Sequence, residues 1–112
     1  MGLIVSPIVE GKLAAWEELV EGITGPRKEE FADFNRRYSL TRHAVWLAKL
    51  PQGWAAVVLI EGPGAGDFLP RITKSTHDFD RWLSSRLAEV HGIDVSMPPP
   101  GSPPELKFDV RL

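Results

Sequence analysis

One histidine and one glutamate, His43 and Glu61, stand at matching ends of two apolar runs that a short turn separates. If Leu50 pairs with Trp54 across that turn, the two ionisable side chains lie opposite each other on one face of a β-hairpin. A carboxylate beside an imidazole raises its basicity and fixes its tautomer, as a general base requires. We therefore take His43 and Glu61 as candidate catalytic residues. The alternative is a cross-strand ion pair, and a shift of one residue in the pairing would place the two on opposite faces.

Three residues at the start of the first run, or just before it, could hold an anionic substrate: Arg37, Tyr38 and Arg42. A guanidinium presents several N–H donors in one plane, which matches the two oxygens of a carboxylate. We take these three as candidate substrate-binding residues. The alternative is a solvent-exposed helix end, because the helix dipole favours positive side chains there.

Little in the sequence points to a metal or a phosphate-bearing cofactor. The histidines His43, His77 and His91 show none of the close spacings that zinc ligands adopt. The glycines of GPGAG at residues 62–66 follow a predicted strand, but the lysine of a phosphate-binding loop is missing. We therefore predict a flexible turn at this place, no metal site and no cofactor.

The candidate residues depend on a hairpin formed by residues 42–50 and 54–61 around the turn sequence PQG. Proline presets φ at the first turn position and glycine accepts a left-handed conformation, which suits a three-residue loop. In this register the face that includes Trp46 is wholly apolar. The other face is apolar in its middle and ends in His43 and Glu61. We predict that helices cover the Trp46 face and leave the His43 face uncovered.

Hydrophobic periodicity predicts the remaining elements of a single domain over residues 1–112. The other predicted strands cover residues 2–8 and 106–112, and the predicted helices cover residues 11–23, 26–38, 67–74 and 75–91. We expect the proline-rich residues 97–104 to cross to the last strand in extended form. The order β-α-β-β-α-β predicts an α+β, ferredoxin-like fold with a four-stranded antiparallel sheet and its helices on one side.

Composition excludes several classes of protein. The formal net charge of −2 argues against a nucleic-acid-binding protein, which would present a basic face. No apolar run approaches the roughly 20 residues of a membrane-spanning helix, so we predict no membrane partner. The chain has no cysteine, which excludes disulfides and thiolate chemistry and fits the reducing cytoplasm that we expect for it.

Five short runs carry a resemblance that covers nearly the whole chain. They are FNRRYSLTR at residues 34–42, VWL at 45–47, FDRW at 79–82, HGID at 91–94 and PPPG at 98–101. With these runs the chain resembles an uncharacterised bacterial family of the dimeric α/β-barrel superfamily. That superfamily includes cofactor-independent monooxygenases, muconolactone-type isomerases, haem-handling enzymes and stress-response members without an assigned reaction. The resemblance therefore implies a fold and a dimer, and no particular substrate.

Two functional hypotheses follow. Because the predicted helices cover one sheet face only, a second copy is expected to bury the other, which predicts a homodimer through the sheet face. In the first hypothesis each protomer binds a small organic acid, as a binding protein or as a cofactor-independent monooxygenase- or isomerase-like enzyme. In the second, the dimer is a structural or interaction module without chemistry, and side chains fill the sheet interface.

Overall fold

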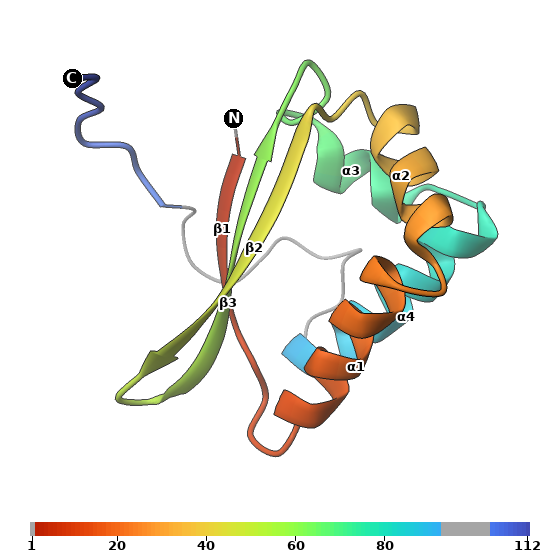
Figure 1. Cartoon of the computed structure of the whole chain (residues 1–112), viewed down its shortest axis with the longest axis horizontal. Coiled ribbons are helices and arrows are strands. Elements are labelled where there is room, and N and C mark those ends of the chain that lie inside the picture. The colour runs from red at the N-terminus through yellow and green to blue at the C-terminus, as the bar shows by residue number, and fades with distance from the viewer. Residues whose placement is uncertain (1, 93–103) are drawn as a thin grey trace.

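A computed structural model of the chain describes residues 2–92 and 104–112. The elements, in chain order, are β1 (Gly2–Pro7), α1 (Leu13–Thr24), α2 (Lys28–Arg37), β2 (Arg42–Leu50), β3 (Gly53–Glu61), α3 (Phe68–Thr73) and α4 (Asp78–His91). They form two layers, with the sheet on one side and the helices on the other (Figure 1). The predicted α+β class and the single helical layer are therefore confirmed.

The sheet has three antiparallel strands in the described part of the chain, in the order β1-β3-β2. The central strand, β3, is apolar from Trp54 to Ile60 and pairs with a strand on each side. The predicted fourth strand at residues 106–112 is not formed: residues 104–112 have no secondary structure and run away from the sheet (Figure 1). Of the proline-rich crossing predicted at residues 97–104, all but the last residue lie outside the described residues.

The hairpin register differs by one residue from the prediction. Leu50 pairs with Gly53 instead of Trp54, so the loop contains two residues, Pro51 and Gln52. Successive side chains of a strand point to opposite sides, so this shift moves every β2 side chain to the other face relative to β3. The predicted assignment of faces is therefore wrong: Trp46 lies on the uncovered face, and His43 lies under the helices.

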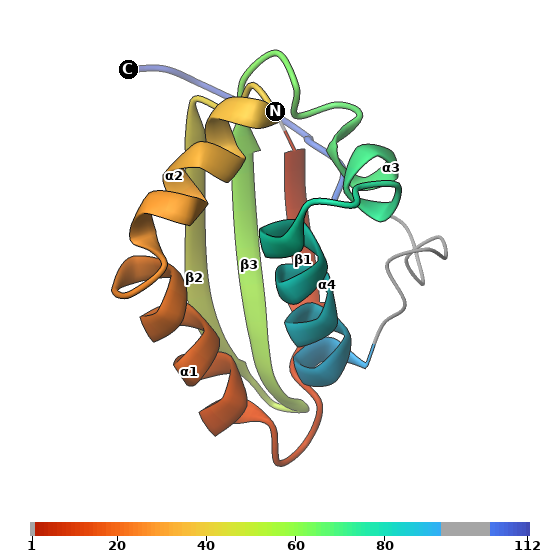
Figure 2. The same cartoon turned by 90° about the vertical axis from the view of Figure 1, so that its right-hand side faces the viewer.

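Aromatic residues dominate the core between the two layers. Phe34 and Phe79 are fully buried and lie edge to face, with ring centroids 5.5 Å apart. Phe68 packs edge to face on Phe34 at 5.7 Å, so one ring of α2 contacts both α3 and α4. From the sheet, Ala56 and Ile60 of β3 face this cluster. Figure 2 shows α1 and α2 lying over the β2 side of the sheet and α4 over the β1 side.

The opposite face of the sheet has no covering element among the described residues. Four of its large apolar side chains are exposed: Leu3 and Val5 of β1, and Trp46 and Leu50 of β2. We call this surface the uncovered face. An antiparallel sheet that meets water usually places polar residues on its outer side, so an apolar outer side indicates a surface that another element buries.

Candidate functional site

A buried carboxylate, that of Asp80, joins the helices at one end of the molecule. Its side chain is fully excluded from solvent although it lies in the first turn of α4. Burying an ionised carboxylate costs free energy unless hydrogen-bond donors surround it. We call Asp80 and its donors Arg37, Tyr38 and Ser75 the Asp80 cluster, and its surroundings form the candidate site.

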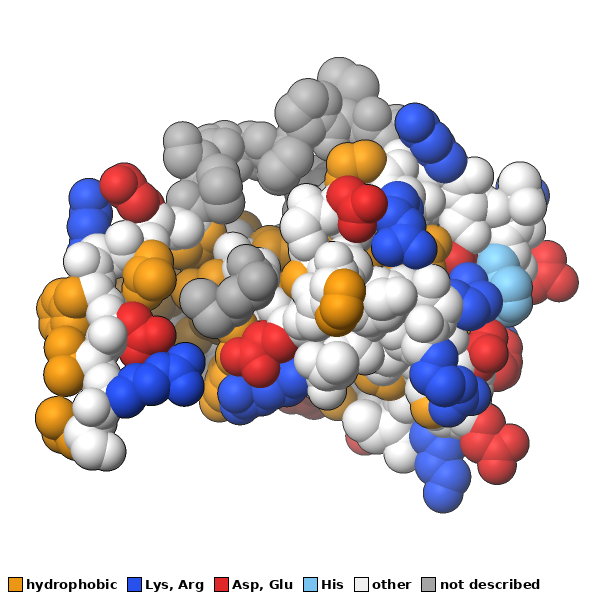
Figure 3. Space-filling model, turned by 90° about the horizontal axis from the view of Figure 1, so that it is seen from above, with side chains coloured by type: hydrophobic (Ala, Val, Ile, Leu, Met, Phe, Trp, Pro, Cys, Tyr) orange, Lys and Arg blue, Asp and Glu red, His pale blue; other side chains and the backbone are white. Residues whose placement is uncertain are grey.

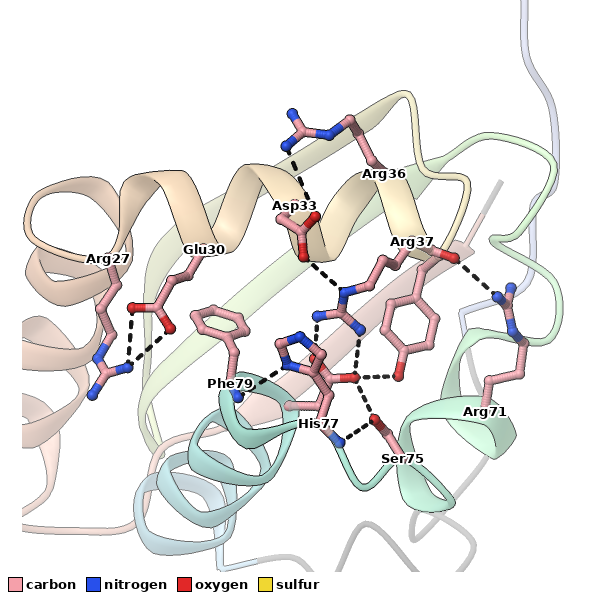
Figure 4. Close-up of polar contacts among 11 residues, drawn as sticks. Arg27, Glu30, Asp33, Arg36, Arg37, Arg71, Ser75, His77 and Phe79 are labelled. Carbon is pink, nitrogen blue, oxygen red and sulfur yellow. Dashed lines mark hydrogen bonds and ion pairs between the residues drawn. The ribbon is translucent and has the colours of Figure 1, made fainter.

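The donors reach Asp80 from two separate parts of the chain. Arg37, in the last turn of α2, donates from Nη1 and Nη2 to the two carboxylate oxygens at 3.0 and 2.8 Å. Tyr38 Oη donates to Oδ2 at 2.7 Å, and Ser75 Oγ, from the loop before α4, donates to the same oxygen at 2.6 Å. The Nε of Arg37 also donates to Asp33 at 2.9 Å, so two carboxylates hold this guanidinium (Figure 4).

These contacts set the charge states of the cluster. Burial acts to raise the pKa of the Asp80 carboxyl, but the hydrogen bonds from Arg37, Ser75 and Tyr38 outweigh it and hold the pKa at about 2. The hydrogen bond to Asp80 raises the pKa of Arg37, and burial together with Asp80 raises the pKa of Tyr38. At neutral pH Asp80 is therefore ionised and Tyr38 protonated, so neither exchanges a proton readily.

A surface cavity of about 370 Å³ lies against this cluster. Arg37, Tyr38 and Ser75 line it from the cluster side, and Arg71 and Lys74 line it from the end of α3. Three of these five residues are cationic. Arg37 is neutralised by Asp80 and Asp33, whereas none of the ion pairs found among the described residues involves Lys74. Arg71 has Asp67 as its own partner, so Lys74 is the lining cation that no ion pair among the described residues neutralises.

Arg71 is held in place at the edge of this cavity. Its Nη2 donates to the carbonyl oxygen of Arg37 at 3.2 Å, which Figure 4 shows as a link from α3 to the end of α2. Its guanidinium lies 4.9 Å from the centre of the Tyr38 ring, and Nη1 lies 3.5 Å from Asp67. A stacked, hydrogen-bonded guanidinium loses less conformational entropy on binding an anion than a free one does.

Close backbone contact brings the two sides of the site together. A Cβ at Gly64 would lie 1.7 Å from the carbonyl oxygen of Tyr38, so only glycine allows the loop after β3 to pass there. The amide of Gly64 donates to the carbonyl of Ser39, which has a left-handed φ of 54° and ends α2. Gly62 and Gly64 thus serve chain packing at this point, whereas Gly66 has open space around it.

The structure separates the three residues predicted to bind an anion. Arg37 and Tyr38 line the cavity together, but Arg42 does not. Arg42 lies on β2 opposite Glu61, with its Nη1 3.8 Å from the glutamate oxygen, and both side chains are substantially exposed. Arg42 therefore belongs to a surface ion pair on the uncovered face.

The predicted pair of His43 and Glu61 is not formed. His43 is opposite Ile60, and its ring lies on the helix side, 5.0 Å from the ring of Phe31. Its Nδ1 is 2.9 Å from Oδ1 of Asn35, and since a carbonyl-type oxygen only accepts, Nδ1 carries the proton. Burial lowers the pKa of His43 to about 4. His43 therefore has neither the carboxylate partner nor the pKa that a general base acting near neutral pH requires.

The other histidines also have local partners. His77 caps α4 by accepting from the Phe79 amide, and Nδ1 of His91 lies 2.8 Å from the Pro7 carbonyl. In the part of the chain that the structure describes, no group of three His, Asp or Glu side chains could hold a metal ion. Within the same residues, no helix has the length and apolar character needed to cross a membrane.

Sequence reasoning missed most of the cavity lining. Arg71, Lys74 and Ser75 come from a short helix and a loop whose position depends on the whole fold. Asp80 did carry a signal, because it lies three residues before Leu83 and so falls on the apolar stripe of α4. An acid on a buried stripe needs a positive partner, and the sequence does not say which of the arginines supplies it.

Comparison with models of protein families, with curated proteins and with solved structures gives no match to this chain. The resemblance to the dimeric α/β-barrel superfamily therefore stays a prediction, and the function has to be argued from the site itself.

We expect Asp80→Asn to lower the free energy of unfolding by about 3 kcal/mol, because the amide cannot neutralise Arg37. Urea unfolding followed by circular dichroism measures this loss. Asp78→Asn is the matched control: it removes an exposed acid from the same helical turn, and the expected change is within about 0.5 kcal/mol. Equal losses in the two variants would contradict the role of Asp80.

We also expect the native protein to lose stability as the pH falls from about 6.5 toward 4. In that range the unfolded chain protonates His43 and the folded chain does not, because the folded pKa is about 4 against an ordinary 6.5. The loss amounts to about 3 kcal/mol and ends below pH 4, where the folded state also binds the proton.

The variant His43→Asn should reduce this pH dependence, since an amide donor replaces the titrating ring. His77→Asn, which keeps a helix cap, should retain it. Melting temperatures recorded between pH 4 and 7.5 distinguish the two. If His43→Asn leaves the slope of the native protein unchanged, His43 is not the group responsible.

Proposed function

We propose that this protein binds a small anionic organic ligand, of the carboxylate class, in the cavity beside the Asp80 cluster. The observation that carries this proposal is the lining: Arg71 and Lys74 bring positive charge to a cavity whose other walls are already hydrogen-bonded. The volume of about 370 Å³ is that of a small-molecule site, and the depression is shallow and open to solvent over most of its boundary.

Each lining residue has a distinct role in this proposal. Arg71 receives the ligand carboxylate, because its stacking on Tyr38 and its bond to the Arg37 carbonyl fix its plane. Lys74 adds a mobile ammonium group on the same side. Tyr38 is buried, so it supports Arg71 from below while its hydroxyl stays directed at Asp80. The ligand therefore meets guanidinium and ammonium groups without displacing the Asp80 cluster.

Binding is favoured over catalysis at this site. Asp80 keeps its charge and Tyr38 keeps its proton near neutral pH, so neither suits a general acid or base. His43 does not line the cavity, and its low pKa makes it a weak base. The first hypothesis allowed either a binding protein or an enzyme. These charge states support the binding protein.

We expect small carboxylates to raise the melting temperature of the native protein, whereas their uncharged amides should not. Benzoate, succinate and citrate are suitable probes, with benzamide and succinamide as neutral counterparts. The double variant Arg71→Ala, Lys74→Ala should weaken binding at least tenfold in calorimetric titration, because hydrogen bonds to charged groups contribute about 1.5 to 3 kcal/mol each.

The matched control is Lys28→Ala, Arg86→Ala, which removes one lysine and one arginine from exposed helical positions outside the cavity. It should leave the affinity unchanged. The proposal fails if no carboxylate binds the native protein, or if both double variants lose affinity equally.

The second candidate function, a homodimeric interaction module, is favoured by a different observation. The uncovered face exposes Leu3, Val5, Trp46 and Leu50, and Trp46 retains half of its accessible surface. Packing two such faces around a two-fold axis would bury these side chains on both copies. The dimer and the ligand site lie on opposite sides of the sheet, so one protein can have both properties.

We expect the native chain to be a dimer at micromolar concentration in light scattering. Trp46→Asp should raise the dissociation constant at least tenfold, because a buried aromatic anchor at an interface is typically worth about 2 kcal/mol or more. The control variant Lys28→Asp introduces an aspartate at an exposed position of α2 instead, and it should leave the dimer intact. A monomer for the native chain at that concentration would contradict the sheet interface.

A further inference from the structure

The last nine described residues, 104–112, form a segment with the pattern of a strand and no strand partner. We call this segment the arm. Leu106, Phe108, Val110 and Leu112 alternate in it with Lys107, Asp109 and Arg111. All four apolar side chains are exposed, from 64% for Leu106 to full exposure for Leu112. Strict alternation of this kind is typical of a half-buried strand, so the arm has an apolar side without anything to bury it.

One edge of the sheet has no charged residue to protect it against pairing. In the order β1-β3-β2, both β1 and β2 have a side without a partner in the part of the chain that the structure describes. Edge strands are commonly guarded by charged residues, and β2 carries Arg42 and Lys49. The sequence of β1, GLIVSP, has no charge, and its one guarding proline, Pro7, stands at the last position of the strand. The β1 edge is therefore the one that can accept another strand.

The arm and the uncovered face both expose apolar side chains, and both lie on the side of the sheet away from the helices. The arm runs on the side of the sheet away from the helices (Figure 1), and Figure 3 shows it at the left, with hydrophobic side chains exposed on it. Leu3 and Val5 of β1 expose apolar surface on that same side of the sheet. A strand added beside β1 would extend this apolar surface with Phe108 and Val110, and leave its charged side chains on the other side.

We propose that the arm of one chain pairs with the β1 edge of a second copy, so that two arms are exchanged in the dimer. Among residues 2–92 and 104–112, neither the arm nor the outer edge of β1 has a strand partner. Exchange gives both backbone edges a partner and converts each sheet from three strands to four. The apolar side of the arm then becomes part of the uncovered face that the second copy buries. The inference goes beyond the ligand site and depends only on the existence of a dimer.

Engineered disulfides test this pairing directly, because the chain has no cysteine of its own. One chain carries Val5→Cys in β1. The other chains each carry one cysteine at a successive position of the arm, from residue 106 to residue 112. After the two chains are mixed, exchanged and mildly oxidised, we expect covalent heterodimers whose yield alternates along the arm, because only every second side chain shares a face with Val5.

Two controls make the result specific. A chain with Lys28→Cys, exposed on α2, should give at least tenfold less cross-linking with the best arm position. A chain that carries both Val5→Cys and the best arm cysteine tells whether the pairing occurs within one chain. An internal disulfide together with no cross-link between mixed chains would overturn the exchange, as would equal cross-linking at every arm position.

A second measurement uses full-length chains without cysteines. Phe108→Asp should raise the dimer dissociation constant at least tenfold, whereas Lys107→Asp, on the charged side of the arm, should change it less than twofold. If neither variant weakens the dimer, the arm does not contribute and the proposal fails. A dimer that persists and still binds carboxylates in that case would leave the proposed function standing while refuting the exchange.

Discussion

The charged contact between Asp80 and Arg37 is the interaction on which the helical layer depends. Its two partners are 43 positions apart in the chain, and it fixes the end of α2 against the start of α4. Tyr38 and Ser75 complete the set of donors, so the carboxylate is buried without an unmet hydrogen bond. Without those donors, a charge in this position would favour opening of the two helices instead of packing.

The same contact prepares the cavity. Because the Asp80 cluster immobilises the end of α2, the Arg37 carbonyl and the Tyr38 ring become fixed supports for Arg71. The site therefore separates two tasks that a single arginine could not perform together. Arg37 stabilises the fold and has its charge neutralised, whereas Arg71, which also contacts Asp67, and Lys74 are exposed at the surface. This division is why the cavity keeps exposed cationic side chains in a chain with a net charge of −2.

The second constraint is geometric: one layer of helices covers one face of a sheet. The aromatic core formed around Phe34 and Phe79 accounts for the helix side, and nothing comparable lies on the other side among the described residues. The uncovered face and the arm expose much of the molecule's apolar surface, and Val9, Val45 and Leu47 are exposed elsewhere. The uncovered face and the arm both lie away from the ligand cavity, so assembly and ligand binding use separate surfaces.

The sequence by itself determined the first three strands, the helices and their order, because apolar spacing of two or of three to four residues depends only on local geometry. The same spacing predicted a strand at residues 106–112 that the structure does not form. The sequence also determined that the sheet has more apolar surface than its helices can cover. Only the tertiary structure decided the hairpin register, since a two-residue and a three-residue loop both suit the sequence Pro51-Gln52-Gly53. The difference of one residue exchanged the surroundings of His43 and Trp46. The tertiary structure likewise decided the partner of Asp80, because contacts between distant residues follow from how the helices pack on the core, which no local pattern records.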